Sequence, residues 1–79
     1  MTLNYDQILK WQRGTMAEQV AAEIASQINN GKLSKWDSLP INRTLADKWD
    51  VSERTITKAK RLLCDHGTLT LVDRRFYVA

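Results

Sequence analysis

The clearest pattern of apolar and polar positions lies between residues 15 and 31. Thr15 and Glu18 have the three-residue spacing of a capping box, which marks the first turn of a helix. Apolar residues then recur at every fourth position, at Met16, Val20, Ile24 and Ile28. Gly31 can take the left-handed conformation that ends a helix. The pattern therefore predicts a helix that ends at Asn30-Gly31, with its Met and Ile stripe in the core.

A shorter helix is expected before it. Asn4 and Gln7 repeat the capping-box spacing, and Gly14 is placed to end the helix. One side would be lined by Tyr5, Ile8, Leu9 and Gln12. This side must be buried, either against the rest of the domain, which we favour, or in a homodimer contact. The candidate dimer contact consists of Tyr5, Ile8, Leu9 and Trp11.

Residues 39–67 are predicted to form two short helices joined by a tight turn. Pro40 permits a helix to start just beyond it. Asn42 is a candidate N-cap, because its side chain can accept from the open amides of the first turn. The inward stripe is formed by Leu45, Ala46 and Trp49. Asp50 interrupts the pattern and Ser52 offers a second N-cap, so the turn is about three residues long.

The second helix of this pair has an apolar side and a basic side. The apolar side is formed by Ile56, Ala59, Leu62, Leu63 and His66, and Gly67 can close the helix. The side chains left facing outward are Arg54, Thr55, Lys58 and Arg61. Basic charge concentrated on a helix that follows a tight turn is typical of helices that enter the major groove of DNA. An ordinary helical hairpin with a solvated charged side remains the alternative.

Two short segments with strand propensity follow Gly67. Residues 68–72 alternate polar and apolar side chains, and residues 76–78 are again β-prone. Between them, Asp73-Arg74-Arg75 places two adjacent arginines at the tip of a hairpin. Since the tip contains no glycine, we expect a three- or four-residue type I loop rather than a two-residue turn with positive φ.

Residues 32–38 connect the first core helix to the helix pair and are expected to be extended, because Leu39-Pro40 disfavours helical geometry. Trp36 in this connector has two interpretations. It could cover an edge of the small core, which is the commoner arrangement, or it could be exposed and stack on a partner.

Three helices followed by a hairpin is the order of a winged helix. We therefore predict a mainly α fold with a small β-hairpin, a winged helix-turn-helix, in a single domain of 79 residues. Residues 1–14 would form an extra N-terminal helix, residues 15–67 the three-helix core and residues 68–79 the wing.

Composition narrows the classes of function. The net charge of +3 and the pI of about 9.3 are a modest basic bias. The single Cys64 excludes an intramolecular disulfide, and one Cys with one His cannot build a tetrahedral zinc site within one chain. No apolar run approaches the roughly 18 residues of a membrane span, and the N-terminus has no signal-peptide pattern. We expect a cytoplasmic protein that binds no metal and no cofactor, and catalysis has no support without a Gly-rich phosphate loop or an acidic pair.

From Gly31 onward the chain resembles the DNA-binding domain of GntR-type bacterial transcription regulators. The matching positions are Gly31, Leu39-Pro40, Arg43-Thr44-Leu45-Ala46, Val51-Ser52, Thr55-Ile56, Ala59, Leu63 and Gly67, at the family's spacing and without gaps. The resemblance implies a transcription regulator that binds double-stranded DNA in a sequence-specific way. The second helix of its helix-turn-helix would lie in the major groove, and its wing would contact the DNA backbone or the minor groove.

This hypothesis gives individual residues a role. The candidate DNA contacts are Arg43, Ser52, Arg54, Thr55, Thr57, Lys58, Arg61, Arg74 and Arg75. The residues nearest the base edges would be Arg54, Thr55, Thr57 and Lys58. Ser52 and Arg43 would hold phosphates, and the two wing arginines would follow the backbone or enter the minor groove. Glu53 could accept from cytosine or support the helix N-terminus, and we favour the second role.

The chain also departs from the family pattern. Ile41 stands where the family usually has Ser, and Asp50 stands at the glycine of the turn. Glu53 and Thr57 replace two arginines that typically contact DNA, so we expect a different operator sequence. Arg74-Arg75 replace a Gly-rich wing tip.

Members of this family carry a C-terminal domain that binds an effector or drives dimerisation, and no such domain follows the last predicted strand. We expect either a stand-alone winged helix, of the kind found in phages, plasmids and other mobile elements, or the DNA-binding fragment of a larger effector-responsive regulator. A winged helix that mediates contacts between proteins is the remaining alternative.

Overall fold

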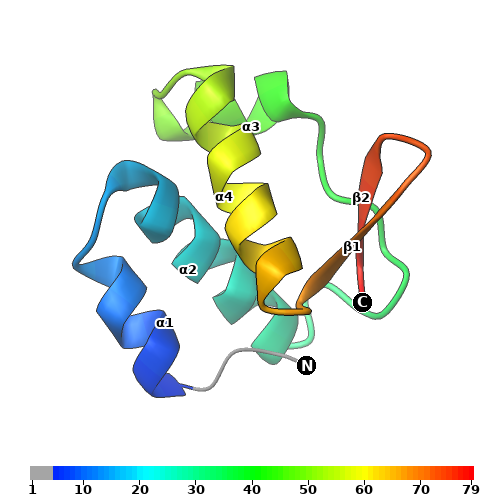
Figure 1. The fold of residues 1–79 in the computed structure, drawn as a ribbon, viewed down its shortest axis with the longest axis horizontal. Helices are drawn as coiled ribbons and strands as arrows, with labels where there is room; N and C mark the ends of the chain where they lie inside the picture. Colours follow the sequence, from blue (N-terminus) through cyan, green and yellow to red (C-terminus); the bar gives the residue numbers. More distant parts are fainter. Residues whose placement is uncertain (1–4) are drawn as a thin grey trace.

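The computed structural model describes residues 5–79, and within them the chain forms four helices and a two-stranded antiparallel sheet (Figure 1). The elements are α1 (Tyr5–Gln12), α2 (Met16–Asn29), α3 (Asn42–Trp49), α4 (Glu53–Asp65), β1 (Leu69–Val72) and β2 (Arg75–Val78). This order confirms the predicted winged-helix class. The expected cap residue Asn4 lies outside the described residues.

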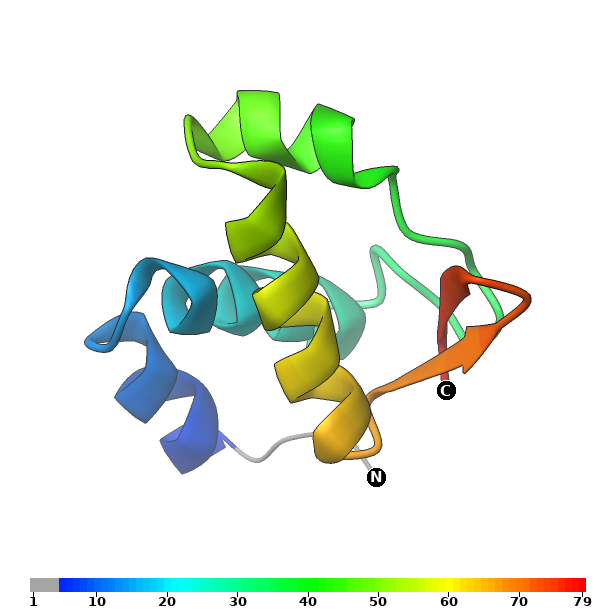
Figure 2. The same ribbon diagram turned by 45° about the horizontal axis from the view of Figure 1, so that its top comes forward.

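The crossing of α2 and α4 forms the centre of the fold. α4 lies across α2, with α1 on one side and the hairpin on the other (Figure 1, Figure 2). The largest fully buried apolar side chains are Val20 of α2 and Ile56 and Leu63 of α4. Burial of each stabilises the fold by about 1.5 to 3 kcal/mol relative to leaving it exposed. The orientation of α4 therefore follows from its contact with α2.

The N-terminus of α2 is capped as the sequence predicts. Thr15 Oγ1 accepts a hydrogen bond from the Glu18 amide at 3.2 Å, and Glu18 Oε1 accepts one from the Thr15 amide at 3.0 Å. The expectation that Met16 lies in the core is wrong, because its side chain is 42% exposed. A four-residue repeat drifts by about 40° per step around a helix of 3.6 residues per turn. Met16, at the start of the repeat, therefore leaves the side that buries Val20 and Ile24.

Helix α1 packs against α2 within the same chain, as we favoured. Ile8 and Trp11 are only 3% and 4% exposed, and both belong to the core. The predicted dimer contact is therefore wrong for these two residues, because their surface is already covered; Leu9, at 39%, is exposed. His66, predicted to face inward, is instead an exposed cap residue beyond the end of α4. Its ring and the Trp11 ring are nearly perpendicular, with 5.0 Å between their centroids.

The helix-turn-helix has the predicted three-residue turn, residues 50–52. Asp50 adopts the left-handed conformation (φ 55°, ψ 49°) that the family resemblance places there. Ser52 caps α4, since its Oγ accepts from the Thr55 amide at 3.2 Å. The predicted cap on α3 is wrong. Ile41 occupies the cap position without a side-chain hydrogen bond, and Asn42 is the first helical residue, whose side-chain amide is directed to α4 instead.

The tip of the hairpin also differs from the prediction. Val72 pairs with Arg75, which leaves a two-residue turn formed by Asp73 (φ 49°) and Arg74 (φ 67°). Positive φ at both positions is the signature of a type I′ turn, whose twist matches that of the two strands. Asp tolerates this conformation better than most residues. The hairpin thus adopts the turn type that matches the twist of its strands, although neither turn residue is a glycine.

The connector, residues 32–38, is partly extended and pairs with β2. Val78 donates its amide to the Asp37 carbonyl at 3.0 Å and accepts from the Trp36 amide at 2.9 Å, and Ser38 forms a bridge with Tyr77. Trp36 does not cover the core. It has a positive φ of 71° and a side chain that is 62% exposed, which corrects the commoner interpretation.

The type I′ turn predicts a stability difference at position 74. Arg74→Gly should be about 1 kcal/mol more stable than Arg74→Ala, because only glycine takes a positive φ without a steric penalty. The two variants lose the same charge, so Arg74→Ala is the matched control. Thermal unfolding of both proteins measures the difference, and equal melting temperatures would contradict the turn assignment.

Candidate nucleic-acid interface

The outward side of α4 carries free positive charge. Arg54, Lys58 and Arg61 are all exposed. Within the part of the chain that the structure describes, none of the three side chains forms a hydrogen bond or an ion pair. The burial of Ile56 and Leu63 against α2 directs these three to the opposite side of the helix. Within residues 5–79 these three side chains thus form no ion pair, although Glu18 and Asp65 line the same depression as Lys58 and Arg61.

Lys60, the fourth basic residue of this segment, belongs to a different environment. It is 4% exposed, and its Nζ donates to the Pro40 carbonyl at 2.9 Å and lies 5.4 Å from the centre of the Phe76 ring. Burial lowers the pKa of its ammonium group. The sequence contains the signal, because position 60 falls on the same stripe as Ile56 and Leu63. The sequence-based division of this helix into inward and outward side chains left Lys60 out.

The first turn of α4 is ordered by its own side chains. Besides accepting from the Thr55 amide, Ser52 Oγ lies 3.1 Å from Thr55 Oγ1. Glu53 is exposed in this first turn, beside the positive end of the helix dipole. The structure thus gives Ser52 a capping role. Arg43, the other predicted phosphate contact, lies in the first turn of α3 and is exposed.

Thr57 is half-buried, and its hydroxyl is occupied within the protein. Oγ1 donates to the Glu53 carbonyl at 3.1 Å and accepts from Asn42 Nδ2 at 2.9 Å. Asn42 was not among the predicted site residues. It is 15 positions away from Thr57 in the sequence, and no local pattern links the two.

The hairpin places its arginines beside α3 and α4. Arg74 and Arg75 are exposed, and both line a depression of about 430 Å³ between the start of α3 and the hairpin. Arg74 also lines a second depression of about 650 Å³, together with Thr57 and Arg61 of α4 and Leu71 of β1. The structure thus brings Arg74 of the predicted wing and Arg61 of the predicted recognition helix to one depression, whereas Arg75 lines the other depression, beside the start of α3.

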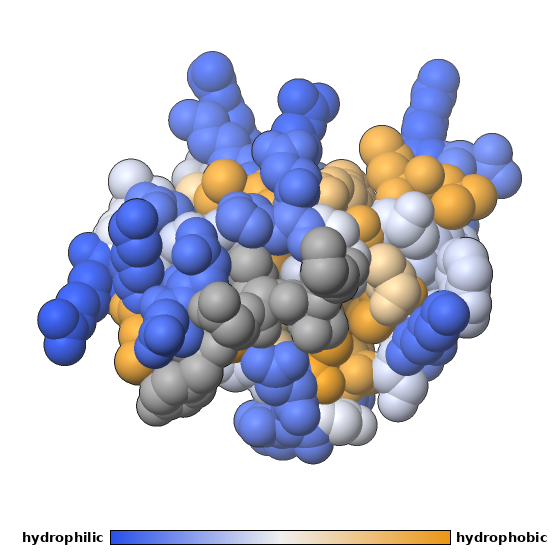
Figure 3. All heavy atoms as spheres, turned by 60° about the horizontal axis from the view of Figure 1, so that its bottom comes forward, coloured by the Kyte–Doolittle hydropathy of each residue, from blue (hydrophilic) through white to orange (hydrophobic). Residues whose placement is uncertain are grey.

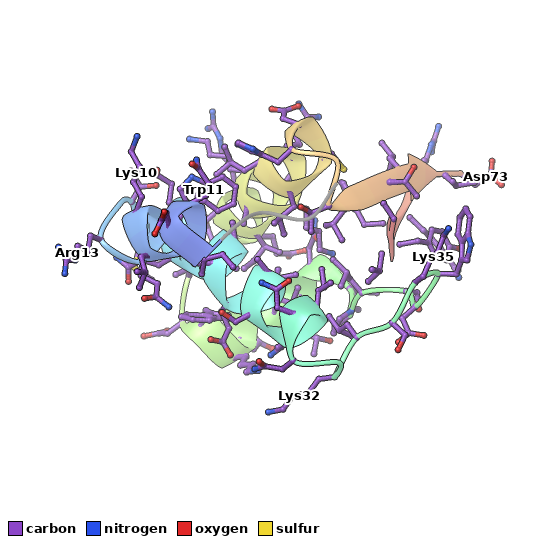
Figure 4. The ribbon with its side chains drawn as sticks, turned by 90° about the horizontal axis from the view of Figure 1, so that it is seen from below. Lys10, Trp11, Arg13, Lys32, Lys35 and Asp73 are labelled. Atoms are coloured by element: carbon purple, nitrogen blue, oxygen red, sulfur yellow. The ribbon has the colours of Figure 1, made fainter. Side chains whose placement is uncertain are left out.

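The hairpin also exposes apolar surface. Leu71 is 56% and Val72 44% exposed. Figure 3 shows an apolar patch at the upper right, on the hairpin side of the molecule, next to projecting hydrophilic side chains. Figure 4 shows α4 and the hairpin on one side of the molecule, whereas Lys32 points away on the opposite side. α4 and the hairpin of the candidate interface therefore lie on the side of the molecule away from Lys32.

Other kinds of site find little support. Residues 5–79 contain no cluster of three or more His, Cys, Asp or Glu side chains that could hold a metal ion. Cys64 is half-buried, and burial, followed by the nearby charge of Asp65, raises the pKa of its thiol, which disfavours the reactive thiolate. Within the same residues, no helix has the length and apolar character needed to cross a bilayer.

Comparisons with known proteins agree with this geometry. A sequence model described as "Bacterial regulatory proteins, gntR family" matches residues 16–77. The uncharacterized HTH-type transcriptional regulator YydK of Bacillus subtilis (strain 168) is 38% identical over 52 residues. That alignment covers 66% of this chain but only 22% of YydK, so the chain spans about a fifth of this curated relative. Helix α1 (Tyr5–Gln12) lies outside the residues matched by the family model.

Solved structures are similar as well, including one of YtrA and one of AraR. YtrA from Sulfolobus acidocaldarius, a GntR-family transcription factor, superposes with a TM-score of 0.78 and 33% identity, covering 84% of this chain and 70% of YtrA. The DNA-binding domain of AraR in complex with operator ORX1 gives a TM-score of 0.79 and 34% identity, covering 84% of this chain and 81% of that one.

The buried Lys60 predicts a pH-dependent difference in stability. Its pKa is lowered from the usual 10.5, so the folded protein binds fewer protons at this site than the unfolded chain. The contribution of the site to stability therefore increases as the pH rises from the lowered pKa to the unfolded value. We expect the wild-type protein to gain stability relative to Lys60→Met as the pH rises towards 10.5. Urea unfolding at a series of alkaline pH values measures this difference, and parallel curves for the two proteins would contradict it.

Proposed function

The chain belongs to the GntR family of bacterial regulatory proteins, and we propose that it binds double-stranded DNA in a sequence-specific way to regulate transcription. The N-terminal half of α4 enters the major groove, and the hairpin lies on the backbone or in the adjacent minor groove. The observation that carries this proposal is the side of α4 formed by Arg54, Lys58 and Arg61, whose side chains are exposed and form no hydrogen bond or ion pair with any of residues 5–79. Access to the chromosome places the protein in the cytoplasm.

The proposed contacts divide into base readers and phosphate contacts. Arg54 and Lys58 donate to guanine, and Thr55 and Thr57 contact the base edges beside them. Arg61, Arg43 and the wing residues Arg74 and Arg75 neutralise phosphates, which fixes the register of α4 on the duplex. Ser52 contributes chiefly through its cap, because its oxygen already accepts from the Thr55 amide.

The DNA-binding domain of AraR is described in complex with operator DNA, and it is 34% identical to this chain. This similarity supports the proposed partner. A module of this size buries only about 600 to 1,000 Å² on DNA, so two copies on adjacent half-sites would strengthen binding. Such a pair would need an interface other than Ile8 and Trp11, which are buried within one chain.

One observation favours a second function. Trp36, Leu71 and Val72 are exposed, and large exposed apolar side chains are more frequent at protein interfaces than elsewhere on a surface. A winged helix that mediates contacts between proteins is therefore the second candidate.

Selection from a random pool of DNA duplexes separates the two candidates. At low salt the protein should enrich one sequence motif, and binding should weaken steeply as salt is added, because phosphate neutralisation releases counterions. No retained duplex at low salt would overturn the proposed function and leave the interaction module.

Arg54 is predicted to specify a base. In the same selection, Arg54→Ala should relax the preference at one position of the motif, with a loss of about 1 to 3 kcal/mol on the preferred duplex. Lys32→Ala is the matched control, because Lys32 projects from the opposite side of the molecule (Figure 4). If Arg54→Ala returned the wild-type motif unchanged, Arg54 would have no reading role.

Arg75 is predicted to contact phosphate and carry no sequence information. Arg75→Ala should weaken binding to all duplexes by a similar factor and reduce the slope of log K against log salt by about one unit. Titrations at four or more salt concentrations measure the slope, again with Lys32→Ala as control. A wild-type slope in Arg75→Ala would remove Arg75 from the interface.

A further inference from the structure

The hydroxyl of Thr57 has no proton left for a DNA base. A hydroxyl has one proton to donate, and Thr57 donates it to the Glu53 carbonyl at 3.1 Å. The same oxygen accepts from Asn42 Nδ2 at 2.9 Å. For Thr57 to donate a hydrogen bond to a base, its bond to the Glu53 carbonyl would have to break.

The two hydrogen bonds also fix the rotamer of Thr57. A threonine in a helix divides between two χ1 rotamers, and the bond from Oγ1 to the carbonyl four residues earlier selects one of them. The bond from Asn42 reaches the same oxygen from α3, where Asn42 is the first residue of the helix. The position of the Thr57 methyl group is therefore set by α3 and α4 together.

The half-buried Thr57 keeps some accessible surface, and this surface belongs to the groove between α4 and the hairpin. Arg61 and Arg74 line the same groove, and Leu71, which is 56% exposed, adds apolar surface to it. With its hydroxyl proton donated to the Glu53 carbonyl, Thr57 cannot donate to a base and also keep that bond, whereas its methyl group can make an apolar contact without breaking either internal bond.

We propose that Thr57 recognises thymine through contact between its methyl group and the C5 methyl of the base, and that Asn42 is the positioning residue that holds this methyl in place. Thymine alone among the DNA bases carries a methyl group in the major groove, so such a contact discriminates without any hydrogen bond. This inference rests on the proposed function, because it requires α4 to lie in the major groove.

Deoxyuridine provides the direct test, since it lacks only the C5 methyl of thymidine. Each thymine of the selected motif is replaced in turn by deoxyuridine, and Kd is measured for the wild-type protein. One position should bind roughly fourfold more weakly, which corresponds to the loss of one buried methyl group. Specific binding with no position sensitive to deoxyuridine would overturn the thymine contact.

Two variants of Thr57 test whether its side chain contacts the thymine at the sensitive position of the DNA. Thr57→Ser keeps the hydroxyl and loses the methyl, so it should bind thymidine and deoxyuridine equally at the sensitive position. Thr57→Val keeps methyl groups and loses the hydroxyl, so it should retain discrimination. If Thr57→Ser discriminated as the wild type does, Thr57 would not be the reader.

Asn42→Ala tests the positioning role. It should reduce the thymidine to deoxyuridine ratio at the same position and leave the salt dependence unchanged, whereas a general loss of structure would weaken both duplexes equally. In a Thr57→Val background, which lacks the hydroxyl that Asn42 binds, Asn42→Ala should leave the ratio unchanged. An unaltered ratio in Asn42→Ala alone would overturn the positioning role. A wild-type protein that binds no duplex would overturn the proposed function itself, so the two failures are distinguishable.

Discussion

The burial of one side of α4 against α2 is the constraint on which the rest of this structure depends. A helix has 3.6 residues per turn, so fixing Ile56, Ala59 and Leu63 in the core also fixes which residues can face solvent. Arg54, Lys58 and Arg61 fall on the opposite side. The apolar contact between α4 and α2 that stabilises the fold therefore also directs the basic side chains of α4 towards solvent. A change in the orientation of α4 would alter both.

A second constraint connects the elements around α4. Lys60 extends from α4 to the Pro40 carbonyl just before α3, and it lies over the ring of Phe76 in β2. Its alkyl chain is buried, while its ammonium group satisfies a carbonyl that would otherwise lack a protein partner at that point. One side chain thus joins the three elements that carry the proposed DNA contacts, despite the unfavourable desolvation of its charge.

The parts of the fold that the sequence predicted are those determined within about four residues. The capping box at Thr15, the Ser52 cap and the left-handed Asp50 are local arrangements, and all three are present in the structure. The cationic side of α4 was predictable for the same reason, because helical periodicity alone separates it from the core.

The predictions that were wrong concern residues whose partners are remote in the sequence. Asn42 leaves the predicted cap because Thr57 supplies a partner 15 residues away. Lys60 is buried because Pro40 lies 20 residues away at hydrogen-bonding distance. Trp36 takes a positive φ where its amide pairs with Val78 near the end of the chain. The periodicity of the sequence does not encode these contacts. It was therefore possible to predict that the site lies on α4, but not which polar groups of its side chains are already hydrogen-bonded within the protein.

The two departures from the family's recognition helix are connected in space. Glu53 and Thr57 stand where the resemblance places arginines, and the Thr57 hydroxyl donates to the Glu53 carbonyl while it accepts from Asn42. An arginine side chain at position 57 has no acceptor for the Asn42 amide, so this pairing requires a residue with an acceptor there, such as threonine. The chain has thus replaced mobile cationic side chains with a short, internally bonded one. Since less charge remains on the first turns of α4, attraction to phosphate must depend more on Arg61, Arg43 and the wing, and base selectivity more on shape than on charge.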